Sequence, residues 1–233
     1  MKIFAFAAIA ALACANPILY NVTVDTSSID GTTGSLDFNF NPGPLITQSA
    51  SLQILGFTSD GTLAGNCPCT TGDVTGQLPA TLTFDNGSFF NDYFDDFTFG
   101  NTLSFQASFF GPALSSPDGT STSGSTFAFS MFSDEGTTPV LTNDTINGFA
   151  FTVNINLDGT TTVANSSPQT TVVPAGTTSA PEPGTFALLA TALIAAAFQR
   201  RLASRSNPTP TFPPNQPSRD HRERSAESFP PRP

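Results

Sequence analysis

The stretch NDYFDDF holds the densest group of oxygen ligands in the sequence, Asn91, Asp92, Asp95 and Asp96. Carboxylate and amide oxygens are the ligands that Ca²⁺ prefers in proteins. Along an extended strand, alternation places Asp92 and Asp96 on one face and Asp95 on the other. The four residues are therefore candidate Ca²⁺ ligands only where a loop or bulge brings them together. The sequence favours the simpler interpretation, a solvated strand edge without a metal, whose charges discourage pairing with other chains.

Catalysis by the usual side chains has little support. Between Asn16 and Ala180 the sequence has no histidine, lysine or arginine, which excludes Ser-His-Asp and Cys-His arrangements there. Glycoside hydrolysis needs only two carboxyl groups. Glu135 is the sole glutamate of this region, however, and the chain has no tryptophan on which a sugar could stack. We expect no enzyme and no catalytic residues, with a hydrolase that pairs Glu135 with an aspartate as the alternative.

Charge is distributed very unevenly along the chain. The formal net charge is −10 at pH 7, the sole lysine is Lys2, and every arginine lies at or beyond Arg200. The region from Asn16 to Ala180 thus carries acids without a single cation. A domain without cations cannot neutralise phosphates, so this composition excludes nucleic acid as its partner.

The N-terminus has the three parts of a secretory signal peptide, residues 1–15. Lys2 gives a positive start, Ile3–Ala13 is apolar, and Ala13-Cys14-Ala15 fits a small-x-small cleavage site. The sequence therefore predicts export and removal of this segment by signal peptidase. A lipoprotein with Cys14 as the lipidated residue is the alternative, although Leu12 lies one position too close to the cysteine.

Export leaves only Cys67 and Cys69, in the segment NCPCTT. A disulfide is permitted outside the cytoplasm, but a bridge across one proline closes a very small, strained loop. We expect two thiols or a small local bridge rather than a metal site, because no histidine lies nearby.

From residue 16 to residue 165 the dominant hydrophobic pattern has a period of two. Apolar and polar residues alternate in the segments 18–25, 36–41 and 149–157, and such alternation is typical of strands with one buried face. Further strands are predicted at 50–58, 78–85, 93–99, 102–110 and 125–132, separated by turn sequences such as Asp30-Gly31 and Asp158-Gly159. We expect an all-β secreted domain, an antiparallel β-sandwich of jelly-roll-like or Ig-like type.

Phenylalanine supplies most of the predicted core. The chain has 23 phenylalanines, and most of them fall on the expected inner strand faces. Phenylalanine has no polar tip that needs a partner, so it suits a dry interior between two sheets.

The composition changes after Asn165. Residues 166–180 are rich in serine, threonine and proline, which predicts an extended linker. Residues 206–233 are rich in proline with mixed charges, which predicts a disordered tail. Between them, residues 185–198 form an apolar run that would make a helix of about 21 Å, a short transmembrane helix. Arg200, Arg201 and Arg205 follow and would hold the C-terminal side in the cytoplasm.

Pro-Glu-Pro, a short apolar helix and an arginine cluster occur here in that order, and residues 181–205 resemble the PEP-CTERM sorting signal. The resemblance implies a Gram-negative envelope and recognition by a membrane-embedded exosortase. It further implies cleavage near the motif, with release or transfer to the cell surface. The segment 185–198 would contact the membrane before that. The chain departs from the usual pattern because 28 residues follow Arg205. The sorting residues implied by the resemblance are Pro181, Glu182, Pro183, Arg200 and Arg201.

Proteins with this signal are associated with exopolysaccharide and with biofilm or floc matrix. The resemblance therefore implies a secreted envelope or matrix protein without catalytic activity, with exopolysaccharide as a candidate partner. The alternative is an extracellular module that binds carbohydrate or depends on Ca²⁺.

Overall fold

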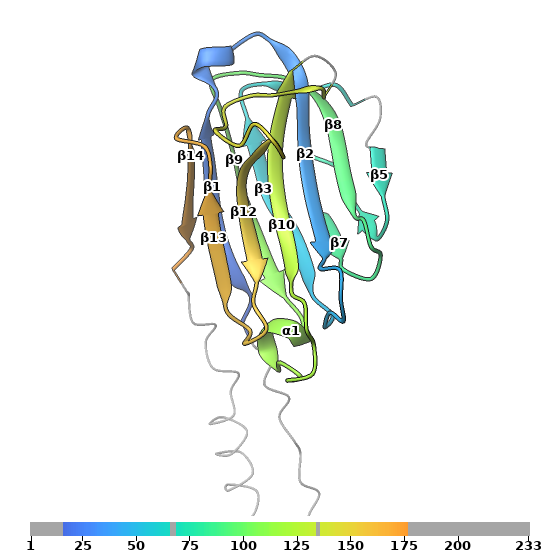
Figure 1. The fold of residues 1–233 in the computed structure, drawn as a ribbon. Helices are drawn as coiled ribbons and strands as arrows, with labels where there is room; N and C mark the ends of the chain where they lie inside the picture. Colours follow the sequence, from blue (N-terminus) through green and yellow to red (C-terminus); the bar gives the residue numbers. More distant parts are fainter. Residues whose placement is uncertain (1–15, 66–68, 134–135, 177–233) are drawn as a thin grey trace, which may run out of the picture. The chain divides into compact units, whose positions relative to one another are not determined.

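A computed structural model describes residues 16–65, 69–133 and 136–176 of the chain. These residues form an all-β fold of antiparallel strands in two unclosed sheets that pack face to face (Figure 1). The expected all-β antiparallel architecture is confirmed, and its jelly-roll-like or Ig-like type stays a prediction.

The first sheet contains β1 (Ile18–Asp25), β3 (Ser51–Ser59), β6 (Val74–Thr75), β7 (Leu82–Asp85), β9 (Thr102–Phe110) and β14 (Thr170–Pro174). Their order across the sheet is β14-β1-β9-β3-β7-β6. The second sheet contains β2 (Thr33–Pro42), β4 (Thr62–Leu63), β8 (Asp92–Thr98), β10 (Ser125–Ser133), β12 (Phe149–Ile155) and β13 (Thr161–Asn165). Their order is β13-β12-β10-β2-β8-β4, and β5 (Cys69–Thr71) and β11 (Thr138–Pro139) pair with β8 and β10. Short helices occupy Ser27–Ile29 and Pro112–Ser115 (α1).

The strands predicted from alternation are confirmed as β1, β2, β3, β7, β8, β9, β10 and β12. The predicted glycine turns are confirmed where the backbone needs a positive φ. Gly159, for example, has a φ of 80° in the turn between β12 and β13, a conformation that glycine adopts without steric cost.

The predicted linker at residues 166–180 is wrong for its first half. Thr170–Pro174 forms β14 and pairs with β1 in the register Val22↔Val172. This strand lies at the edge of its sheet and buries only Thr170 completely, so its sequence lacks the apolar alternation that marks a strand with a buried face. Proline at its end is compatible with an edge position.

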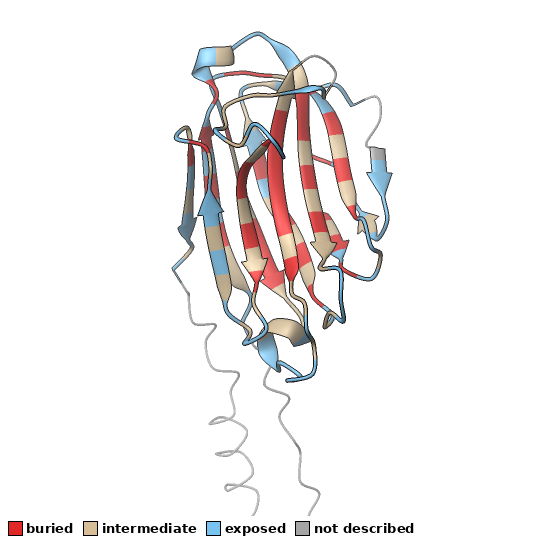
Figure 2. Ribbon diagram, in the orientation of Figure 1, coloured by how far each residue is buried: buried red, intermediate tan, exposed pale blue. Residues whose placement is uncertain are grey.

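Phenylalanines from both sheets meet in the core. Figure 2 shows buried positions alternating along β2 and β8. Phe105 of the first sheet lies 5.3 Å from Phe38 and 5.2 Å from Phe129 of the second, measured between ring centroids. The buried phenylalanines are Phe38, Phe40, Phe57, Phe84, Phe97, Phe99, Phe105, Phe109, Phe127, Phe129 and Phe151.

Several predicted features lie outside the described residues. They are the signal peptide 1–15, Cys67, Glu135, the second part of the linker from residue 177, the apolar run 185–198, the sorting residues Pro181, Glu182, Pro183, Arg200 and Arg201, and the tail 206–233. In the part of the chain that is described, no helix is long and apolar enough to span a membrane.

Candidate functional site

The acidic stretch at Asp92–Asp96 lies on β8, which is not an edge strand of its sheet. One side of β8 pairs with β2, and the other side pairs with β4 and β5. The expectation of a free edge guarded by charge is therefore wrong, because short strands that the sequence pattern does not reveal cover it. The predicted alternation is confirmed: Asp95 is buried, whereas Asp92 is half-buried and Asp96 is exposed on the opposite face.

Asn91 is fully buried and bound to protein groups through both ends of its amide. Its Nδ2 donates to the carbonyl oxygens of Phe40 and Ser88, both at 2.9 Å, and its Oδ1 accepts from the Asp73 N–H at 2.8 Å. The amide thus joins β2, the loop before β8 and the turn at Asp73. Asn91 acts here as a structural connector between backbone segments.

Replacing Asn91 by alanine is expected to lower the free energy of unfolding by about 3 kcal/mol, because three buried or half-buried backbone groups lose their partner. Urea unfolding measures this effect. Asn21→Ala is the matched control, since Asn21 is exposed and accepts one hydrogen bond, from Gln106. Equal small losses for the two variants would show that the Asn91 contacts contribute little.

Asp95 lies in the core rather than at a ligand site. Its side chain is 1% exposed, Oδ2 accepts from the Tyr93 hydroxyl at 2.9 Å, and Oδ1 has no partner. The Tyr93 oxygen accepts in turn from the Leu78 N–H. Burial raises the pKa of Asp95. The structure thus separates Asn91, Asp95 and Asp96 from one another, and among the described residues no three acidic, histidine or cysteine side chains gather to hold a metal ion.

Asp92 has a different neighbour, Asp37 of β2. The strand register places Asn39 opposite Asp92 and Asp37 one pleat further along, and all three lie on the outer face of the second sheet. The Asp37 and Asp92 carboxyl groups are hydrogen-bonded to each other. Asn39 Nδ2 donates to Asp37 Oδ1 at 2.6 Å.

Burial and mutual repulsion favour a state in which the two carboxyl groups hold one proton between them. Burial, the hydrogen bond to Asp92 and repulsion from the Asp92 carboxylate together raise the pKa of Asp37 to about 9. Burial also raises the pKa of Asp92, and the hydrogen bond with Asp37 acts in the opposite direction. Like charges held close together cannot both ionise, and no cation exists in this domain to relieve them.

The carboxyl pair lies in a pocket of about 410 Å³, which we call the outer-face pocket. Its lining is Asp37, Asn39, Asn41, Phe90, Asp92, Thr126, Ala128 and Phe149. Asn39 Oδ1 and Asp92 Oδ1 are buried acceptors without a hydrogen-bond partner. Buried acceptors of this kind are normally satisfied in proteins, so these two oxygens are exceptions beneath the surface of the pocket. Phe90 is 48% exposed and adds an apolar surface.

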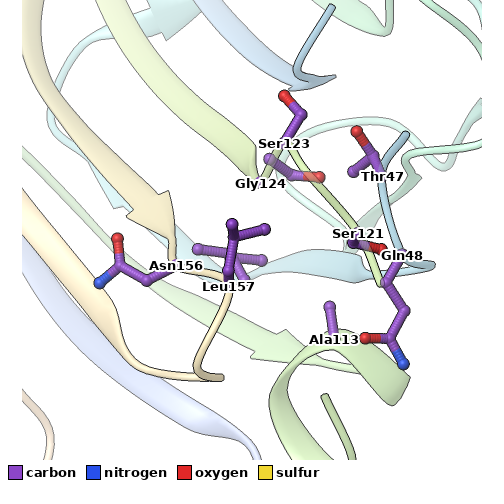
Figure 3. Close-up of a pocket in the computed structure, with 10 residues that line it drawn as sticks. Thr47, Gln48, Ala113, Ser121, Ser123, Gly124, Asn156 and Leu157 are labelled. Carbon is purple, nitrogen blue, oxygen red and sulfur yellow. The ribbon is translucent and has the colours of Figure 1, made fainter. Parts of the chain in front are cut away.

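A second cavity is too small for an organic ligand. It lies between the loops at one end of the sandwich, next to Thr47, Ser123 and Leu157 (Figure 3). Its volume of about 10 Å³ corresponds to a single water molecule. The outer-face pocket is the candidate functional site of the described domain because the Asp37–Asp92 carboxyl pair and Asn39 line it.

Sequence reasoning identifies Asp92 but not its partners Asp37 and Asn39. The signal for them is present in the segment SLDFNFN, where Asp37, Asn39 and Asn41 alternate with phenylalanine and so share the face opposite the core. What the sequence does not supply is the pairing of β2 with β8, which joins residues far apart in the chain.

Comparison with protein families identifies a match near the C-terminal end of the sequence. The family model of the PEP-CTERM protein-sorting motif matches residues 179–201 and confirms the resemblance of this segment. The motif implies export, a C-terminus anchored in the membrane before processing, and recognition by an exosortase. We found no match for the chain among curated proteins or solved structures.

Proposed function

Because the chain is a PEP-CTERM sorting domain-containing protein, we propose that it is a non-catalytic component of the cell envelope or extracellular matrix of a Gram-negative bacterium. The observation that carries this proposal is the sorting motif at 179–201 behind a domain that has no lysine, arginine or histidine. Signal peptidase removes the N-terminal segment, exosortase acts on the C-terminal one, and the β domain is delivered to the surface with exopolysaccharide as its partner.

The carboxyl pair does not suit hydrolysis. A retaining glycosidase separates its two carboxyl groups by about 5 Å, and an inverting one by more, so that substrate and water fit between them. Asp37 and Asp92 instead bond directly to each other. We infer that the domain is not an enzyme, and we expect incubation with matrix polysaccharide to release no new reducing ends.

The outer-face pocket supports a second candidate function, binding of carbohydrate. Sugar hydroxyls can exchange hydrogen bonds with the polar side chains of Asn39 and Asp92 that line the pocket, and the ring of Phe90 offers a face for the sugar C–H groups. Ca²⁺ fits less well, because it requires six to eight oxygen ligands. Here the Asn41 Oδ1 already accepts from the Asn91 N–H at 2.6 Å, and a proton occupies the carboxyl pair.

Two measurements test these functions separately. Deleting the gene is expected to reduce the exopolysaccharide retained by washed cells, because the matrix loses a protein component. An unchanged matrix in the deletion strain argues against the envelope or matrix role. For the pocket, sedimentation of the purified protein with the matrix polysaccharide is expected to weaken in Asn39→Ala and to persist in the exposed control Asn21→Ala. Equal sedimentation of both variants removes the pocket from the interaction.

A further inference from the structure

One end of the sandwich carries both ends of the described chain. β1 begins here beside the end of β9, with Ile18 opposite Phe109, and the chain leaves after β14, where the Ala175 N–H donates to the Leu19 carbonyl oxygen at 2.8 Å (Figure 1). We call this the terminus end. The strand registers place these loops at it: 43–50, 86–91, 111–124 and 156–160.

Large apolar side chains are exposed at the terminus end. Leu45 is 65% exposed, Ile46 68% and Phe89 77%, and Leu157 at the tip of the β12–β13 turn is 50% exposed. At the opposite end, among the described residues, Ile146 is the one large apolar side chain of comparable exposure. Exposed apolar side chains gathered at one end of a domain mark an interaction surface.

Hydrogen bonds hold these loops in place. Thr47 forms a bridge with Ser123, and Gln48 Nε2 donates to the Ser116 carbonyl oxygen at 2.9 Å. Asn86 Nδ2 donates to the Gln48 carbonyl oxygen, also at 2.9 Å. Figure 3 shows residues of the loops 43–50, 111–124 and 156–160 meeting around the small cavity. The exposed apolar side chains are therefore carried by loops that are hydrogen-bonded to one another.

Only a short segment of chain separates the terminus end from the predicted membrane anchor. The described residues end at Gly176, the sorting motif begins at residue 179, and its apolar run begins at Thr185. Nine residues span at most about 30 Å even when fully extended. A C-terminus anchored in the membrane therefore keeps the terminus end within that distance of the bilayer surface.

We propose that the terminus end rests on the bilayer while the chain is anchored, with Leu45, Ile46, Phe89 and Leu157 in the lipid interface. The domain has no cations, and the Asp118 carboxylate at this end has its pKa lowered to about 2 by N–H and O–H donors from Ser121 and Thr120, so it stays charged. Attraction to anionic headgroups is thus absent, and apolar insertion into a neutral interface is the mode of contact. The proposal depends on the membrane anchor and is independent of the proposed matrix role.

Single tryptophans test this contact cleanly, since the chain has none of its own. The full chain is reconstituted in phosphatidylcholine vesicles with and without brominated acyl chains. Emission from Ile46→Trp and Leu157→Trp is expected to shift to the blue and to be lost in brominated vesicles. Emission from the control Ile146→Trp, at the opposite end, is expected to stay red and unquenched by bromine. All three positions are half exposed or more, so folding should be preserved, and circular dichroism verifies it.

Each other result overturns the proposal. Equal quenching of all three variants by aqueous acrylamide, without bromine quenching, places the terminus end in water. A blue shift without bromine quenching shows that protein, such as a second copy of the chain, covers it. A final comparison adds Leu45→Ser and Ile46→Ser to the Leu157→Trp variant, and bromine quenching is then expected to fall. Unchanged quenching would show that these loops do not carry the contact.

Discussion

Replacing Phe38 by alanine is expected to lower the free energy of unfolding by about 4 kcal/mol. Phe38 is fully buried on β2. Between ring centroids it lies 4.9 Å from Phe129 of the same sheet and 5.3 Å from Phe105 of the facing sheet. Truncation removes the transfer free energy of the ring and leaves a cavity between the two sheets. A loss of this size is a large part of the total stability of an ordinary domain. Urea unfolding followed by circular dichroism measures it.

Phe89→Ala is the control for the core substitution. Phe89 is 77% exposed, so its removal is expected to change the free energy of unfolding by less than about 0.5 kcal/mol. Similar losses for Phe38→Ala and Phe89→Ala would mean that aromatic contacts between the sheets do not hold the domain together.

The protein is expected to be more stable near pH 5 than near pH 8. Asp37 has a pKa of about 9 in the folded state and about 3.9 in the unfolded chain. Between these values the folded state binds the extra proton, so the stability present at low pH declines as pH rises. The free energy of unfolding is expected to fall by up to about 1.4 kcal/mol per pH unit. Thermal unfolding across this range measures the decline.

Asp37→Asn is expected to remove most of this pH dependence and to stabilise the protein at pH 8. The asparagine Nδ2 replaces the shared proton as donor to Asp92, and its oxygen keeps the hydrogen bond from Asn39. The control is Asp158→Asn, because Asp158 is exposed and its pKa is lowered by hydrogen bonds from Thr160. A wild-type protein that gains stability from pH 5 to pH 8, or a variant that behaves like the wild type, refutes the shared proton.

Exposed aspartates are expected to lower the stability of the protein at strongly acidic pH, where they become protonated. Hydrogen bonds from Asn101 and Thr102 lower the pKa of Asp60 to about 2, and Asp118 is lowered to about 2 as well. Their contributions are present above the unfolded value of about 3.9 and are lost as pH falls toward 2. Together with Asp37 they place the stability maximum on the acid side of neutrality.

The strands that bury one apolar face could be predicted from the sequence. Alternation in segments such as 149–157 determines which side chains point inward, and this suffices for β1, β2 and β12. β14 could not be found in this way, because an edge strand that buries one threonine has no apolar pattern. The same holds for β4 and β5, which cover β8 with backbone hydrogen bonds that leave no mark in the sequence.

The sequence could predict the acidic residues of the candidate site but could not predict which of them lie next to each other. The sequence shows the acids of NDYFDDF, and alternation correctly separates Asp95 from Asp92. The carboxyl pair depends instead on the register of β2 against β8, which is set by packing across the whole sheet. Asn91 is a candidate metal ligand by sequence, but in the structure its side-chain amide is already hydrogen-bonded to backbone groups from three separate segments.

The most direct measurement is the intact mass of the exported protein, purified through a tag placed before Pro181 from strains with and without exosortase. Processing at the sorting signal predicts a shorter protein that lacks the apolar run 185–198 in the first strain, and an uncleaved C-terminus in the second. An identical mass in both strains, with every residue after Pro183 still present, would contradict the sorting that places this domain outside the cell.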